Sequence, residues 1–511
     1  MLNKIYKYIY LLAFVIVAYL LLPMANGDYL YTIQDNSAFI MGKTFMRDTI
    51  ESHGWVAWVS CYLTQFFYHP WLGSTILIAL WAITYLLMLS TFQWHGKWCF
   101  LALLPNLFFL FWTLDYGYWI YYTKTVGFVF NHTLMFFILM LSTFLLKHIM
   151  LRFFIYRGKL KFTIPYHACL LCCAIGLPQL GPWHFGDHQS EFMVTMRNEN
   201  FRHELKMYRA VEEGRYEDVI NEMQLCKEAP TNLMVLFKNI ALMHTNRLTD
   251  LFKTNNCGVM LETGDSLQVR ISQLAAPLIY YQFGQFNYAY RWAMENNVQR
   301  RFSFRNLKMM TLCALFNQEF ELAQKYITLL KATTFQRQWA IEHEAWLKNS
   351  TNFMQSKEFQ QLQPLMNDDT NCLDDDEGLC ENYLLDHFSN LRHAASPLLE
   401  DVILCTSLWK EDGYAFCIHF YDYVQNHPNA TIPTLYQEGA ILLGNMEESP
   451  ITIDNFQFDA IVSEKYYRFA HDYNQLSQQG LSQEEMGKRL RPQYGDTYWW
   501  YYYFYTDFNI Y

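Results

Sequence analysis

The chain has 511 residues, of which 52% are hydrophobic, 18% aromatic and only 17% charged. Soluble proteins carry about 25% charged residues, so this composition excludes a disordered chain, a basic nucleic-acid-binding protein and a coiled-coil rod. Residues 1–185 hold 11 Lys and Arg against 5 Asp and Glu, whereas residues 186–511 hold 27 against 43. We therefore expect an apolar, slightly basic transmembrane domain over 1–185 and an acidic, water-compatible domain over 186–511.

Long uncharged stretches in the first domain predict membrane-spanning helices, each of which needs about 20 apolar residues. The stretches between Lys7 and Asp28, Lys124 and Lys147, and Lys161 and Asp187 each fit one span. The shorter stretch between Lys97 and Asp115 can also cross the membrane if Asp115 lies at the membrane interface. The predicted spans are about 8–26, 74–93, 98–116, 127–147 and 163–183.

A further segment, 54–70, is uncharged but carries Ser60, Thr64, Gln65 and His69 near one helical face before it stops at Pro70. Such an amphipathic stripe is more typical of an interfacial or re-entrant helix than of a span. The alternative is a sixth span at this segment. It would move the most basic loop, which carries Lys147, Arg152, Arg157, Lys159 and Lys161, to the outside.

Basic residues indicate the orientation, because Lys and Arg concentrate in cytoplasmic loops. Five spans place the N-terminus and the basic loop in the cytoplasm and residues 186–511 in the periplasm. A cleaved signal peptide is an alternative for the first span, since a short basic start precedes its apolar run, and it leaves the orientation unchanged. The basic residues concerned are Lys4, Lys7, Lys97, Lys147, Arg152, Arg157, Lys159 and Lys161.

The second domain has apolar residues at three- and four-residue intervals, which predicts amphipathic helices. Three segments within 200–335 repeat, and Phe286 to Phe320 is a spacing of 34 residues. NRLTDLF at 246–252 lies between the first two as a degenerate unit. These segments resemble the tetratricopeptide repeat, in which a small residue lets two helices cross closely and an aromatic fills the gap between repeats. The residues that carry the resemblance are Gly214, Tyr216, Val219, Tyr280, Gly284, Phe286, Ala289, Phe320 and Ala323, with Gln318 in place of a glycine.

The expected fold is thus all-α: a transmembrane block of about five spans and an interfacial helix, followed by a tetratricopeptide-like α-solenoid. Helical hairpins continue through 336–490, for example at 410–428, without a defensible period. An irregular stack of α-hairpins with chance spacing is the alternative.

The order of parts also resembles an uncharacterised family of bacterial inner-membrane proteins, classed only as a domain of unknown function. The resemblance rests on a polar first loop, LTQFFYHPWLG at 63–73, a block of spans, a helical tail and GDTYWWYYYF at 495–504. It implies a bacterial envelope protein and brings no known activity with it.

Polar residues at membrane depth are functional candidates because they are costly there. Asp35, Asp115 and His132 are all expected on the outer side of the membrane and would be the catalytic candidates of an enzyme. An acidic residue in the first outer loop, followed by a membrane-parallel helix, is similar to glycosyltransferases that use lipid-linked sugars. In that family the acidic residue activates the acceptor as a base, a role that would fall to Asp35. Those enzymes have more spans, and headgroup-contacting interfacial carboxylates are the simpler interpretation.

Other motifs predict little chemistry. Cys372 and Cys380 bracket an acidic loop at 367–381 and could form a disulfide if that domain is periplasmic. The loop lacks the spacing of a calcium-binding EF-hand, and no metal or cofactor is predicted. Asn106, which follows Pro105, is expected to satisfy a kinked backbone rather than serve transport. The aromatic run at 498–505 suits either a membrane interface or a buried terminal cap.

The sequence therefore predicts a non-enzymatic inner-membrane scaffold whose helical repeats bind one or more envelope proteins in the periplasm. Its expected partners are the lipid bilayer and proteins with basic surfaces, and nucleic acid is not among them. The alternative is an envelope glycosyltransferase with an outward-facing membrane active site.

Overall fold

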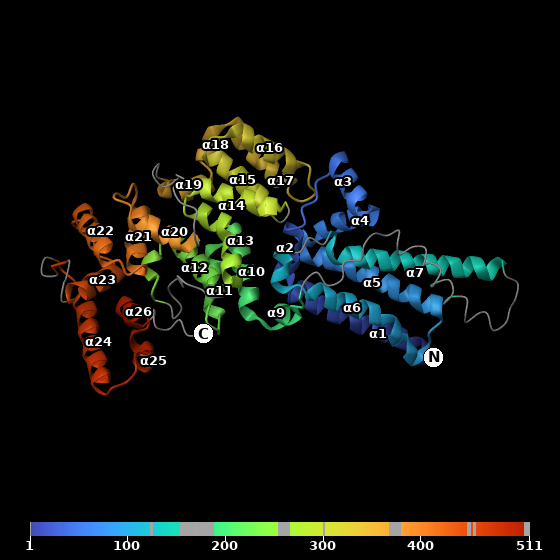
Figure 1. The fold of residues 1–511 in the computed structure, drawn as a ribbon, viewed down its shortest axis with the longest axis horizontal. Coiled ribbons are helices and arrows are strands. Elements are labelled where there is room, and N and C mark those ends of the chain that lie inside the picture. Colours follow the sequence, from blue (N-terminus) through green and yellow to red (C-terminus); the bar gives the residue numbers. More distant parts are fainter. Residues whose placement is uncertain are drawn as a thin grey trace. The chain divides into compact units, whose positions relative to one another are not determined.

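A computed structural model describes residues 2–122, 126–153, 165, 169, 189–253, 266–299, 302–366, 380–446, 451–452 and 456–504. These residues form helices and no strand (Figure 1), which confirms the all-α class. They group into two compact units. Unit 1 comprises Met1–Leu205 and Ala293–Lys348, and unit 2 comprises Lys206–Trp292 and Asn349–Tyr511.

The first group of helices includes the apolar helices and ends with α10 at Glu212. Their bounds are α1 (Leu2–Tyr19), η1 (Leu20–Met24), α2 (Gly27–Asp35), α3 (Lys43–His53), α4 (Trp55–Thr64), η2 (Gln65–Tyr68), α5 (Pro70–Phe92), η3 (Gly96–Leu103), α6 (Leu104–Leu114), η4 (Gly117–Tyr121), α7 (Phe128–Phe153), α9 (Phe192–Arg197) and α10 (Glu199–Glu212).

The remaining helices are mostly short and follow one another through tight turns. They are α11 (Tyr216–Leu225), α12 (Asn232–His244), η6 (Leu248–Asp250), α13 (Ser266–Gln282), α14 (Phe286–Gln299), α15 (Phe304–Phe316), α16 (Phe320–Lys331), α17 (Arg337–Lys348), α18 (Ser350–Met354), α19 (Lys357–Leu362), η7 (Gln363–Leu365), α20 (Cys380–Ser389), α21 (Pro397–Trp409), α22 (Gly413–Asn426), α23 (Thr434–Gly444), α24 (Ala460–Gln478), α25 (Gln483–Tyr494) and α26 (Tyr498–Phe504).

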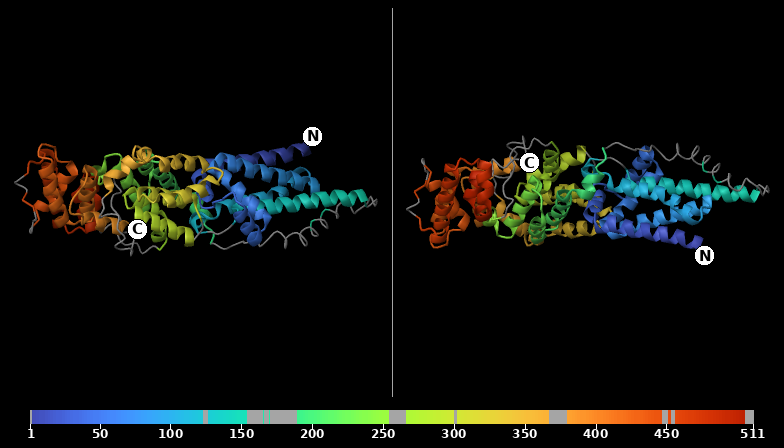
Figure 2. Two further views of the ribbon diagram at one scale, coloured as in Figure 1. Left: turned by 90° about the horizontal axis from the view of Figure 1, so that it is seen from above. Right: turned by 90° about the horizontal axis from the view of Figure 1, so that it is seen from below.

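Four helical stretches in the described part of unit 1 are long and apolar enough to cross a membrane. They are Ile5–Met24, Pro70–Phe92, Gly96–Leu114 and Phe128–Ile149, and they match four of the five predicted spans. The fifth predicted span, 163–183, lies outside the described residues apart from Pro165 and Cys169. Figure 2 shows these helices running alongside one another. Large apolar side chains such as Leu12 and Leu107 remain exposed on them, as lipid-facing surfaces require.

Side-chain contacts give the direction of each helix in this bundle. Near one end the Tyr19 hydroxyl donates to Thr75 Oγ1 (2.9 Å), and near the other the Tyr85 hydroxyl donates to the Lys7 carbonyl (3.1 Å), so α1 and α5 are antiparallel. Trp81 bonds Thr133, and Lys147 bonds the carbonyl of Thr91, so α7 runs parallel to α5.

The α6 helix is antiparallel to α7, since Trp112 lies near His132 and Phe109 near Phe136. The bundle therefore has an end with Asp115, which we call the Asp115 end, and an opposite end with Lys97, the Lys97 end.

The segment predicted as an interfacial helix, 54–70, forms α4 and η2. Of the four polar residues in the predicted stripe, Ser60, Thr64 and Gln65 are at most 1% exposed, whereas His69 is exposed. Thr64 Oγ1 donates to the Gly127 carbonyl (3.1 Å), and Gln65 Nε2 donates to the Ser37 carbonyl (2.7 Å). Thr64 and Gln65 thus turn inward and satisfy backbone carbonyls of neighbouring loops.

Helices α15–α17, from the acidic half of the sequence, belong to unit 1 together with the apolar helices. Phe304, Ile327 and Ala340 form a core against which Ala38 packs. The Met41 backbone N–H donates to the Ala332 carbonyl (2.7 Å), and the Tyr68 ring stacks on Phe335 at 5.1 Å. The compact units thus differ from the compositional division at residue 185, because packing joins segments that composition separates.

Candidate functional site

Asp35 is the last residue of α2 and lies at the N-terminus of α15. Its Oδ1 accepts a hydrogen bond from the Arg305 backbone N–H (3.0 Å), and its Oδ2 lies 3.6 Å from Arg305 Nε. The two side chains are only 2% and 8% exposed. A carboxylate at a helix N-terminus is favoured by the unpaired N–H groups and the helix dipole. Asp35 therefore caps α15 and neutralises a buried guanidinium.

Two tyrosines of η4 continue this polar region. The Tyr121 hydroxyl is hydrogen-bonded to the Arg305 side chain, and the Tyr118 hydroxyl donates to Glu204 Oε2 (2.8 Å). Burial raises the pKa of both tyrosines above the ordinary value, and the neighbouring Glu204 carboxylate acts in the same direction. Both are therefore neutral phenols: Tyr118 donates to Glu204, whereas Tyr121 accepts from the Arg305 guanidinium, which has no acceptor of its own.

Asp115 follows α6 at the Asp115 end of the bundle and contacts Ser190 and Glu191. The Ser190 hydroxyl donates to Asp115 Oδ1, and the Glu191 backbone N–H donates to the Asp115 carbonyl (2.9 Å). The Glu191 carboxylate in turn accepts from the Tyr118 backbone N–H at 2.6 Å. Burial raises the pKa of Glu191, and the nearby Asp115 charge adds to this shift.

Gly117 makes this contact possible. Its φ is +49°, in the region that favours glycine, and a Cβ there would lie 2.4 Å from Glu191 Oε2. Its backbone N–H also donates to Thr195 Oγ1 (3.1 Å). A side chain at this position would both strain the backbone and displace Glu191.

His132 is 2% exposed on α7, with its ring 5.8 Å from that of Trp112. Trp112 Nε1 donates to the Tyr116 hydroxyl (3.0 Å), so His132 also lies near the Asp115 end. Asp35, Asp115 and His132 thus occupy the same end of the bundle, and all three are buried. We call this set the Asp115-end cluster: Asp35, Asp115, Tyr118, Tyr121, His132, Glu191, Glu204 and Arg305.

Sequence reasoning missed Arg305, Glu191, Glu204 and both tyrosines. Glu204 had a signal, because it lies on the same helical face as the apolar Phe201 and Tyr208. Arg305 had none, since 270 residues separate it from Asp35. The cluster contains paired and hydrogen-bonded groups, and among the described residues no three His, Cys, Asp or Glu could hold a metal.

Three positions of the predicted repeat, Gly214, Gly284 and Gln318, lie at helical hairpin turns of one geometry. Among the described residues, five turns contain a residue with a φ between 55° and 76°. The N–H of that residue donates to the carbonyl three residues earlier, and the next N–H donates to the carbonyl five residues before itself. This pair of bonds is the Schellman motif that ends helices in the left-handed conformation. The five residues are Gly214, Asn246, Gly284, Gln318 and Glu411.

The helices after the turns at Gly214, Gly284 and Gln318 begin at Tyr216, Phe286 and Phe320, and Ala289 and Ala323 are fully buried. Phe286 is 1% exposed, whereas Phe320 is 42% exposed. Tyr280 stacks on Tyr288 at 5.2 Å. Tyr216 stacks on His244, and its hydroxyl donates to Gln282 Oε1 (3.1 Å), which links α11 to α12 and α13.

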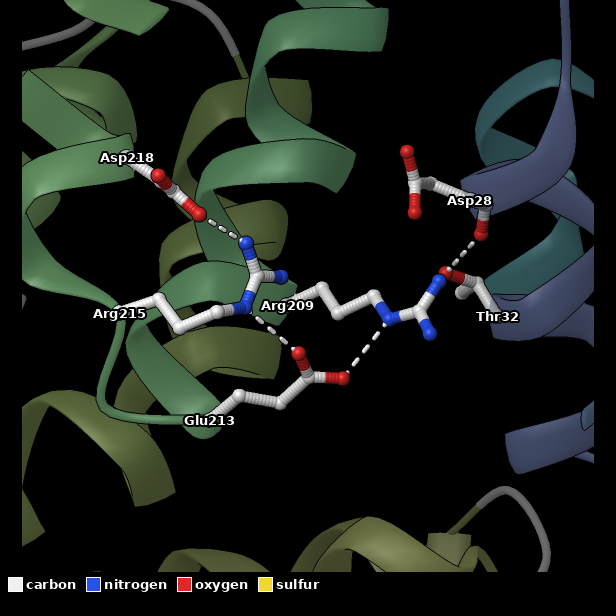
Figure 3. A network of polar contacts seen from close by, with 6 residues as sticks. All are labelled: Asp28, Thr32, Arg209, Glu213, Arg215 and Asp218. Carbon is white, nitrogen blue, oxygen red and sulfur yellow. Dashed lines mark hydrogen bonds and ion pairs between the residues drawn. The ribbon is translucent and has the colours of Figure 1, made fainter. Parts of the chain in front are cut away.

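The Gly214 turn also carries a surface ion network (Figure 3). Arg215 Nε lies 2.8 Å from Glu213 Oε2, and Arg209 Nε lies 2.9 Å from Glu213 Oε1. Arg215 also pairs with Asp218 in the first turn of α11. Burial opposes the ionisation of Glu213, but the two guanidinium groups hold its pKa below the usual range. In unit 1 the same figure shows the Thr32 hydroxyl donating to the Asp28 carbonyl within α2.

The remaining predicted features lie in the C-terminal part. Cys380 is buried at the start of α20, but Cys372 and nearly all of the acidic loop lie outside the described residues. The aromatic run forms α26 in the interior of unit 2. There the Tyr501 hydroxyl donates to the Trp409 carbonyl (2.8 Å), and the Tyr498 N–H donates to Glu438 Oε2 (2.9 Å).

Four apolar helices of spanning length in an all-α chain suggest an integral membrane protein. The chain belongs to a family of unknown function, DUF6057, whose family model matches residues 2–156 and 121–505. No curated protein and no solved structure matches it.

Proposed function

We propose that this chain is an inner-membrane scaffold whose helical repeats bind proteins during assembly of a bacterial envelope. The carrying observation is the combination of a four-helix apolar bundle with hairpins that share one turn geometry. Stacked helical hairpins form extended surfaces that commonly bind peptides and proteins. The acidic excess over residues 186–511 favours partners with basic surfaces.

The direction of the bundle supports a periplasmic placement of the repeats. Lys7, Lys97 and Lys147 lie toward one end, whereas Asp28, Asp35 and Asp115 lie at the other. By the positive-inside rule the Lys97 end faces the cytoplasm. Helix α7 ends at the Lys97 end, whereas Glu191, which follows it in the sequence, contacts Asp115 at the opposite end. This arrangement supports an odd number of membrane crossings.

The glycosyltransferase alternative has less support from the site. A general base must reach the proton of its substrate, yet Asp35 is 2% exposed and bonded to Arg305. The pairing and capping of Asp35 account for its position without catalysis. The scaffold is therefore the function that the geometry supports best.

Site-specific photo-crosslinking in cells tests the scaffold proposal. On α24, Ile461 is 74% and Tyr467 58% exposed, and Tyr467 lines a groove of about 600 Å³ with Arg468 and Tyr494. A photoreactive residue at either position should yield the same protein adduct. Trp98, at the Lys97 end and 55% exposed, is the matched control and should not yield it. Absence of any protein adduct at both α24 positions would contradict the proposal.

A further inference from the structure

Two lysines at the Lys97 end lie over exposed aromatic rings. Lys7 Nζ is 4.5 Å from the ring centroid of Tyr8, and Lys97 Nζ is 5.6 Å from that of Trp98. Tyr8 is 59% and Trp98 55% exposed. Exposed Tyr and Trp with adjacent Lys are typical of side chains at the boundary between hydrocarbon and headgroups.

The two lysines come from neighbouring elements. Helix α1 packs on η3, and the Lys7 carbonyl accepts from the Tyr85 hydroxyl at 3.1 Å. The Lys7 ammonium also interacts electrostatically with the side chain of Cys99, two residues after Lys97. Both lysines thus belong to the Lys97 end of the bundle, on two elements that pack against each other.

A third lysine of the bundle differs from these two, because it is buried and hydrogen-bonded. Lys147 is 3% exposed and donates to the carbonyls of Ser90 and Thr91, both at 2.8 Å, at the C-terminus of α5. Lys7 and Lys97 make no ion pair with the described residues, and residues 52–114 contain no Asp or Glu. Among the described residues, their charges are thus not neutralised by a carboxylate.

We propose that Lys7 and Lys97 form a binding site for the phosphate of an anionic phospholipid. The phosphate would lie between the two ammonium groups, and the acyl chains would follow the exposed apolar side chains of α1 and η3, including Ile9, Leu12 and Phe100. This site rests on the membrane anchoring in the proposed function, but not on the binding of any envelope protein.

The test uses the full chain in mild detergent with added phosphatidylglycerol, with phosphatidylcholine, or with inorganic phosphate. Thermal melting and native mass spectrometry report binding. Phosphatidylglycerol alone should raise the melting temperature and stay bound. Each lysine near an anionic surface contributes about fivefold in affinity, so Lys7→Gln/Lys97→Gln should bind phosphatidylglycerol roughly 25-fold more weakly.

Two controls make the outcome decisive. Lys43→Gln removes an exposed lysine outside the bundle and should keep full binding, as should the charge-preserving Lys7→Arg/Lys97→Arg. Equal binding by wild type and the double Gln variant, or an equal shift with phosphatidylcholine or inorganic phosphate, would overturn the lipid site. Extraction of wild-type membranes with alkaline carbonate separately reports anchoring, so that failure of the lipid site is distinguishable from failure of the membrane placement.

Discussion

Asp35 pairs with Arg305, and the pair is nearly inaccessible to solvent. Removing one member of a buried ion pair leaves an uncompensated charge, which typically costs about 3–5 kcal/mol. The same substitution in an enzyme would abolish activity without such a loss of stability. Asp35 therefore separates the two candidate functions at the scale of one residue.

We expect Asp35→Asn to lower the free energy of unfolding by about 3 kcal/mol, because the Arg305 guanidinium then lacks its counter-ion. Thermal melting of the full chain in detergent measures this. Asp48→Asn is the control, since Asp48 is 60% exposed on α3 and should change stability by less than about 0.5 kcal/mol. Wild-type melting together with a lost cellular phenotype would instead favour the catalytic role of Asp35.

Glu438 predicts a pH dependence of stability. Burial raises the pKa of its carboxyl to about 8, an effect that the N–H of Tyr498 and the charge of Lys465 only partly oppose. The folded chain then holds a proton that the unfolded chain releases near pH 4.5. The stabilisation is therefore fully present below about pH 4.5 and is lost as the pH rises through about 8.

Melting temperatures from pH 5 to 8 should thus fall more steeply for wild type than for Glu438→Gln, by up to about 1.4 kcal/mol per pH unit in unfolding free energy. Glu464→Gln, at a position 66% exposed, is the control and should follow the wild-type slope. Parallel curves for wild type and Glu438→Gln would contradict a buried, protonated Glu438.

At the scale of elements, the five Schellman turns explain both the fit and the degeneracy of the repeat. A left-handed residue other than glycine costs roughly 1 kcal/mol, and Asn246, Gln318 and Glu411 bear that cost. A sequence pattern that demands glycine finds only two of the five turns. The hydrogen bonds, which involve backbone atoms only, are the same in all of them.

Gln318→Gly should therefore stabilise the chain by up to about 1 kcal/mol. Gly284→Ala should destabilise it by about 1–2 kcal/mol, because its φ is +76° and a Cβ would lie 3.1 Å from the Leu365 carbonyl oxygen. Gly214→Ala isolates the backbone contribution, since nothing lies within 4 Å of its Cβ position. Melting curves check the order of the three variants. A destabilised Gln318→Gly would show that the side chain outweighs the turn.

At the scale of the whole molecule, topology decides where any partner or substrate is met. We expect alkaline phosphatase fused after Tyr511 to be active and green fluorescent protein at the same position to be dark. The physical reason is the basic Lys97 end, which should stay in the cytoplasm. The reverse pattern would give an even number of crossings and place the repeats in the cytoplasm. Expression levels of both fusions, measured by immunoblot, are the control.

Much of the fold could be predicted because its causes are local. The all-α class and four apolar spans follow from hydropathy and from the cost of unsatisfied backbone in lipid, and the family of unknown function was indicated by short motifs. The solenoid as a whole remains a prediction, although its turns share one geometry. The sequence does not decide whether the aromatic run at 498–505 lies at a membrane interface or in a buried terminal cap. In the structure, Tyr498 and Trp499 are at most 1% exposed.

The sequence by itself determined which segments are apolar enough to enter a membrane and where charge accumulates. Those properties depend on residues a few positions apart, whose energies can be read along the chain. Only the tertiary structure decided that Asp35 pairs with Arg305, that the polar face of α4 turns inward, and that α15–α17 pack with the apolar helices. These outcomes depend on contacts between residues far apart in the chain, where burial and hydrogen-bond satisfaction outweigh local pattern.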